Sequence, residues 1–141
     1  MRQLWIGTIA LAGLVASACT TASEAPKLPT YKATLAPGAG ITSSGSGVGE
    51  FTYDPAARVL TYNVTFSGLT GPVMAAHIHG PAEPGANAGP VVPLAGATSP
   101  MTGTATLTDA QAAELAAGRY YVNIHTSANR GGEIRGQITA N

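Results

Sequence analysis

The feature that most constrains the fold is a two-residue alternation of apolar and polar side chains, interrupted at short intervals by glycine and proline. It is clearest over 58–69 (RVLTYNVTFSGL), where every second residue is a large apolar one: Leu60, Tyr62, Val64 and Phe66. Successive side chains of a β-strand point to opposite faces of its sheet, so this alternation predicts a strand with one buried and one solvent-facing side.

The same pattern recurs along most of the chain. It predicts six further strands, at 31–35, 49–54, 72–80, 101–107, 119–126 and 132–140. DPAA (54–57) predicts a turn that joins two of them into a hairpin. One helix is expected at 109–117, because Thr108 and Gln111 can form a capping box and Gly118 can end it. The fold class is therefore all-β, an antiparallel Greek-key-like sandwich or flattened barrel with one short helix.

The N-terminal segment has the layout of an export signal. Arg2 is followed by an apolar run from Leu4 to Val15, which is shorter than the roughly 20 residues that a membrane-spanning helix needs. We expect a signal peptide over 1–18. ASAC (16–19) resembles a bacterial lipobox, which implies cleavage before Cys19 and attachment of lipid to its sulfur. The alternative is ordinary secretion with an incidental cysteine.

The residues after Cys19 are small and polar and include two prolines. Such a composition cannot bury enough apolar surface to fold, so 19–29 is expected to be a flexible tether and 30–141 a single domain. Cys19 is the only cysteine, and an intrachain disulfide is therefore excluded. Without Arg2 the chain has six basic and seven acidic residues, a net charge of −1, and this balance argues against nucleic-acid binding.

The three histidines carry the strongest functional signal. His77 and His79 lie two residues apart in AAHIHGP (75–81), so they share one face of the expected strand while Ile78 faces the core. His125 occupies a similar place in YVNIHTS (121–127). If the two strands are neighbours, three imidazoles meet on one patch. Neutral imidazole is a good ligand for copper and zinc, and three ligands with an open position suit an accessible metal site.

Other polar residues are weaker candidates. Glu83, in the long irregular segment 80–100, could fold back over the imidazoles, and Asn123 and Arg135 could surround the ion and support its ligands. Glu133 and Arg135 are two apart, which predicts an exposed ion pair at a strand edge. The isolated Met74 and Met101 are expected to fill the core.

The chain resembles the CHRD (chordin-type) domain, a module of many secreted bacterial proteins. Three phrases carry the resemblance: AAHIHGPA (75–82), GRYYVNIHT (118–126) and GGEIRGQI (131–138). It covers nearly the whole chain after the tether and implies an all-β fold, while the biochemical role of the family is poorly defined. A partial resemblance to Cu/Zn superoxide dismutase rests on the His-x-His phrase, but a fourth copper histidine, zinc ligands and a cysteine pair are lacking.

We therefore expect a lipid-anchored protein of the cell envelope that binds a metal ion through His77, His79 and His125. Copper is favoured, with zinc as the alternative. The expected partners are the membrane, through the lipid, and the ion, and a binding protein is expected rather than an enzyme. Two alternatives stay open: an adhesion or protein-binding module whose histidines are structural, and an enzyme of the superoxide dismutase type.

Overall fold

The computed structural model describes residues 25–141, and the expected signal peptide and Cys19 lie outside them. Within this part, residues 25–29 are exposed and form no regular element. The elements that follow are β1 (Thr30–Pro37), β2 (Ser46–Asp54), β3 (Val59–Ser67), β4 (Val73–His79), β5 (Pro90–Pro93), β6 (Met101–Thr106), α1 (Asp109–Ala116), β7 (Tyr121–Thr126), β8 (Ile134–Gln137) and β9 (Thr139–Ala140). None of the described helices is long and apolar enough to span a bilayer.

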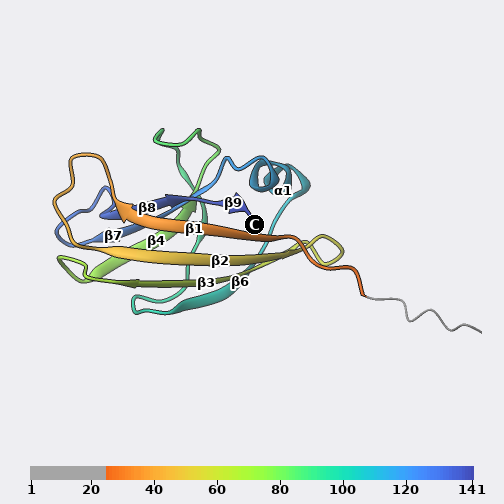
Figure 1. Cartoon of the computed structure of the whole chain (residues 1–141), viewed down its shortest axis with the longest axis horizontal. Coiled ribbons are helices and arrows are strands. Elements are labelled where there is room, and N and C mark those ends of the chain that lie inside the picture. The colour runs from red at the N-terminus through yellow and green to blue at the C-terminus, as the bar shows by residue number, and fades with distance from the viewer. Residues whose placement is uncertain (1–24) are drawn as a thin grey trace, which may run out of the picture.

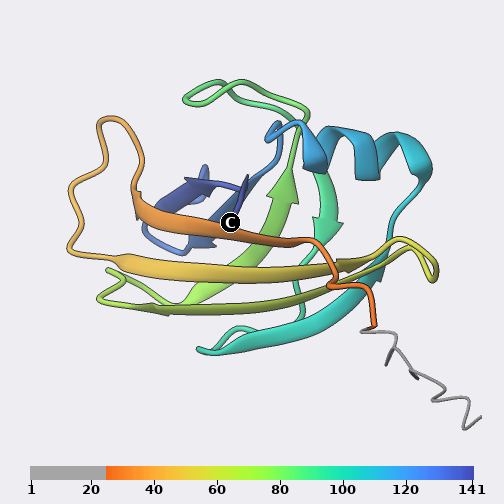
Figure 2. The same ribbon diagram turned by 45° about the vertical axis from the view of Figure 1, so that its right-hand side comes forward.

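The strands form two antiparallel layers that are joined through β1. One layer has the order β6-β3-β2-β1, with β9 beside the start of β1; the other has the order β5-β4-β7-β8 (Figure 1). The two layers meet where β1 ends, because Ala36 and Pro37 pair with Arg135 and Ile134 of β8. The strands β1 to β3 run side by side, and β4 crosses them steeply (Figure 2). The expected all-β antiparallel fold with one short helix is confirmed, in the form of a nearly closed, flattened barrel.

The core lies between the layers and follows the sequence alternation. On β3, Leu60, Tyr62 and Val64 are buried while the residues between them face solvent or are half-buried. Facing them from the second layer are Ile78 of β4 and Ile124 of β7, both fully buried. Burying a side chain of this size stabilises the fold by about 1.5–3 kcal/mol. The inward-facing residues named here were correctly predicted from the alternation.

The helix and the first hairpin also form as predicted. The Thr108 side chain accepts a hydrogen bond from the Gln111 amide, and the Gln111 side chain accepts one from the Thr108 amide, which completes the capping box. Gly118 follows the helix with a φ of +71°, a conformation that glycine adopts without strain. In the hairpin, the Asp54 carboxylate accepts hydrogen bonds from the amides of Ala56 and Ala57. Local signals were sufficient for both features.

The segment 80–100 contains a strand that the sequence did not predict. β5 pairs with β4 at the edge of its layer, with His77 opposite Pro93 and Ile78 opposite Val92. Proline cannot donate a ladder hydrogen bond, so PVVP reads as loop; an edge strand tolerates prolines because one side of its backbone needs no partner.

Two predictions about single residues were wrong. Met74 is not core filler: its side chain is 60% exposed, because the pairing of β4 with β7 shifts register between Val73 and Ala75. Glu133 forms no strand-edge ion pair with Arg135; it precedes β8 and is fully buried, held by hydroxyl and amide donors. Neither a bulge nor a distant hydroxyl partner leaves a periodic signal in the sequence.

Candidate metal centre

The pairing of β4 with β7 brings the three histidines together. The two strands are antiparallel neighbours in which Ala75 lies opposite His125 and His77 lies opposite Asn123. His77 and His125 are therefore diagonal neighbours on the same face, a relation that keeps long and aromatic side chains within reach. His79 follows on β4, opposite Tyr121. The condition on which the predicted patch depended, adjacency of the two strands, is met.

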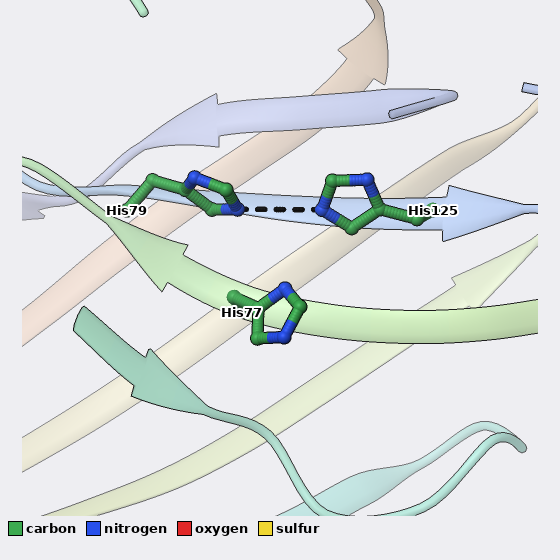
Figure 3. A group of neighbouring side chains, drawn as sticks. All are labelled: His77, His79 and His125. Carbon is green, nitrogen blue, oxygen red and sulfur yellow. Dashed lines mark hydrogen bonds between the residues drawn. The ribbon is translucent and has the colours of Figure 1, made fainter. Parts of the chain in front are cut away.

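The three rings form a nearly equilateral triangle. Their centroids are separated by 5.5 Å for His77 and His79, 5.4 Å for His77 and His125, and 5.4 Å for His79 and His125. One nitrogen from each ring lies within 4.8 Å of those of the other two, so the group can hold a metal ion. Figure 3 shows the rings of His79 and His125 meeting edge to edge, with His77 below the gap between them.

Two loop carbonyls fix the protonation of the facing rings. The Nδ1 atom of His79 lies 2.9 Å from the Ala88 carbonyl oxygen, and Nδ1 of His125 lies 2.9 Å from the Arg130 carbonyl oxygen. A carbonyl can only accept, so each neutral ring carries its proton on Nδ1 and leaves the Nε2 lone pair free. These two Nε2 atoms are 3.3 Å apart. Two lone pairs therefore face each other, an arrangement that a shared cation would stabilise.

His77 has a different environment. Its Nδ1 atom is buried and has no hydrogen-bond partner within the described residues 25–141. Burial lowers the pKa of His77, and the neighbouring His125 and His79 lower it further. Burial also lowers the pKa of His79; the Ala88 carbonyl opposes this effect, while His125 and Arg135 add to it. Two of the three rings, His77 and His79, thus favour the neutral form, which is the form that binds metals.

A stack of side chains supports His79 from behind. The His79 ring stacks on Tyr121, with centroids 5.2 Å apart and planes inclined by 18°. The Arg135 guanidinium lies 3.8 Å from the centroid of the Tyr121 ring. Arg135 donates hydrogen bonds to Asn87 and Ala86, and the Tyr121 hydroxyl bonds to the backbone of Ala88. The loop that carries the Ala88 carbonyl is thereby tied to the same stack.

The predicted supporting residues divide into two groups. Asn123 lies beside His77 in the register and donates a hydrogen bond to the Gly131 carbonyl, and Arg135 takes part in the stack. A Cβ at Gly132 would collide with the Asn123 amide, so the chain passes Asn123 closely only because glycine is there. Glu83, in contrast, is directed to Arg119, with 3.8 Å between its carboxylate and Nε, and it does not line the histidine patch.

The sequence did not indicate four contributors to this site: Tyr121, the carbonyl of Ala88, the carbonyl of Arg130, and Met74. The carbonyls belong to loop backbone, which has no residue-type signal, and Tyr121 reads as an ordinary strand aromatic. Met74 borders the same open hollow of about 400 Å³ as the histidines. The described residues that line this hollow are Met74, Ala75, His77, His79, Pro90, His125 and Arg130.

Comparison with known families identifies the domain. The CHRD domain model matches residues 31–138, which extend from the second residue of β1 to the residue before β9 and include all three histidines. No functionally curated protein and no solved structure was found with significant similarity. The partial resemblance to Cu/Zn superoxide dismutase accordingly stays a prediction from the sequence. Because the family model covers well over half of the chain, this protein belongs to the CHRD domain family.

Proposed function

We propose that this protein is an exported, lipid-anchored CHRD protein of the cell envelope that binds a metal ion, with copper favoured, through His77, His79 and His125. The observation that carries the proposal is the pair of Nε2 atoms 3.3 Å apart, each made a free acceptor by the loop carbonyl at its Nδ1. Two acceptors at this distance repel each other unless a cation or a proton lies between them. Burial lowers the pKa of His79, which supports a metal ion rather than a proton on that ring.

The separation of the two facing nitrogens, Nε2 of His79 and Nε2 of His125, suits a bound ion. Two nitrogens bound at about 2.0–2.1 Å to one tetrahedral ion are themselves about 3.3 Å apart. The third imidazole lies at a similar centroid distance from both, and its buried Nδ1 has no competing partner within residues 25–141. A hydrogen bond from the remote ring nitrogen to a carbonyl, as in His79 and His125, is the usual support of a metal-binding histidine.

Ligand chemistry supports copper as the favoured ion. Imidazole binds copper, zinc and nickel, and copper heads the affinity order of the divalent first-row metals, with zinc below it. The hollow beside the rings is open, so the ion is reached from solvent and a position stays free for a further ligand. An accessible, incomplete site favours metal capture or handover at the cell surface over a purely structural ion.

The proposed location rests on two observations. CHRD domains are typical of secreted, extracellular proteins. The apolar run before ASAC and the single cysteine after it have the layout of a lipoprotein signal. A lipid on Cys19 would leave residues 20–29 as a tether between the membrane and β1. The metal site would then face the space outside that membrane.

The decisive experiment uses His77, because its ring makes no hydrogen bond with any described residue. His77→Ala removes a ligand without detaching a loop, so it should abolish the rise in melting temperature on adding Cu or Zn while the apo protein melts as the wild type does. Lys32→Ala, on the other layer, is the matched control. Wild-type protein without a melting shift, or a His77→Ala variant with an undiminished one, would contradict the site.

The pH dependence gives a second check on the same proposal. Protons compete with the ion for imidazole nitrogen, so affinity should fall as the pH is lowered. Since burial lowers the pKa of His77 and His79, the loss should be centred below 6.5, the ordinary histidine value. The affinity can be measured by competition with a chelator of known affinity. An affinity that stays constant between pH 7 and pH 5 would show that imidazoles are not the ligands.

A second function is favoured by the loop contacts themselves. His79 and His125 each join a strand to a loop carbonyl, as expected of an adhesion or protein-binding module with structural histidines. In that case His79→Ala and His125→Ala should destabilise the apo protein, and wild-type protein should gain no stability from metal. A superoxide dismutase assay of the copper-loaded form distinguishes simple binding from catalysis.

A further inference from the structure

Met74 is the one large apolar side chain of β4 that faces solvent instead of the core. In the regular alternation it would join Ala76 and Ile78, which are 2% and 0% exposed, yet Met74 is 60% exposed. The cause is the shift of register between Val73, which pairs with Thr126, and Ala75, which pairs with His125. Bulges of this kind redirect a side chain and often occur beside functional sites.

The redirected side chain borders the histidine patch. Met74 lines the same open hollow as His77, His79 and His125. Exposing a thioether rather than burying it gives up the stabilisation that the core would supply, about 1.5–3 kcal/mol for a side chain of this size. The exposed sulfur can instead act as a metal ligand beside the three imidazole nitrogens. Thioethers are soft ligands that prefer Cu(I).

The charges around the hollow point to the same ion. None of the seven described residues that line it is acidic, and one of them, Arg130, is cationic. A second cation, Arg135, lies behind Tyr121, with its guanidinium carbon 3.8 Å from the centroid of the Tyr121 ring. The three imidazoles and the Met74 thioether are all neutral donors. No ligand therefore offsets the positive charge of Arg130 and Arg135. The repulsion grows in proportion to the charge of the ion, so it opposes a divalent ion about twice as strongly as a monovalent one.

We propose that the Met74 thioether is a fourth ligand of the ion and gives the site a preference for Cu(I) over Zn(II). This inference rests on the proposed metal-binding function and adds to it the sulfur ligand and the oxidation state. The bulge supplies the ligand, and the neutral donor set with its two neighbouring arginines supplies the preference for a single positive charge.

The test compares Met74→Leu with Met101→Leu in the full chain carrying Cys19→Ser, which removes the only thiol. Leucine keeps the volume and apolar character of methionine. Met101, 1% exposed, is a thioether that does not line the hollow. Cu(I) is titrated anaerobically against a chromophoric Cu(I) chelator, Zn(II) against a zinc indicator, and sulfur scattering is measured by X-ray absorption at the copper edge.

We expect Met74→Leu to weaken Cu(I) binding by about tenfold or more, the range seen when a group that supports a metal site is lost. Zn(II) affinity should stay within about twofold of the wild type. Sulfur scattering should be present in the parent and in Met101→Leu and absent in Met74→Leu. Undiminished Cu(I) affinity, or a parent without a sulfur ligand, would overturn the inference while leaving the histidine site intact. A parent that binds neither ion would overturn both proposals.

Discussion

Replacing the buried Glu133 with glutamine should destabilise the domain and change its response to acid. The side chain is 0% exposed, and its carboxylate accepts four hydrogen bonds: from Ser43 Oγ at 2.6 Å, the Thr70 amide at 2.7 Å, Thr70 Oγ1 at 2.9 Å and Thr126 Oγ1 at 2.7 Å. Burial by itself would raise the pKa of this carboxyl. The four donors outweigh burial and lower it from 4.5 to about 2.

The magnitude follows from this pKa. The difference between 4.5 and about 2, at ~1.4 kcal/mol per pH unit, corresponds to about 3 kcal/mol of stability. Because the folded-state pKa lies below the unfolded-state value, this contribution is complete above about pH 4.5 and is lost as the pH falls towards 2. Glutamine keeps the shape but not the charge, so up to about 3 kcal/mol should be lost at neutral pH.

The assay is urea unfolding of the wild type, Glu133→Gln and Glu50→Gln between pH 7 and pH 2.5. Glu50 is an exposed carboxylate on β2, and its replacement should stay within about 0.5 kcal/mol of the wild type. The melting temperature of Glu133→Gln at pH 7 should fall by up to about 12–24 °C, at 4–8 °C per kcal/mol. The difference between wild type and Glu133→Gln should shrink as the pH falls. A constant difference over this range would refute the assignment of an ionised, hydrogen-bonded Glu133.

Two further predictions concern the N-terminal part of the chain. Cys19→Ser should release the protein from the membrane fraction to the soluble fraction, since stable anchoring depends on the lipid; a variant that fractionates as the wild type does would contradict lipid attachment. Deleting residues 20–28 should leave the melting temperature within a few degrees, because residues 25–28 are exposed and outside any element, whereas Pro29 is kept since its carbonyl accepts a hydrogen bond from the Tyr53 amide. A large loss of stability on calorimetry would show that the tether belongs to the fold.

The sequence by itself determined most strands and the side of each that is buried. Strand alternation is a property of local chain geometry. The sequence of β3 alone therefore indicates that one face is shared by Leu60, Tyr62 and Val64. The helix signals are equally local, because the capping box joins residues three apart. For the same reason the sequence placed His77 and His79 on one face of a strand and set Ile78 against the core.

Only the tertiary structure decided the features that depend on which strands become neighbours. His125 lies 46 residues after His79 in the sequence. It reaches the other histidines only because β7 pairs with β4. The free Nε2 atoms depend on carbonyls of two loops, and Glu133 depends on donors 90 and 63 residues away, at Ser43 and Thr70. The bulge that turns Met74 outward arises from the fit of β4 against β7. Side-chain period is fixed within one strand, whereas pairing, bulges and hydrogen-bond partners are fixed by segments that meet only when the chain folds.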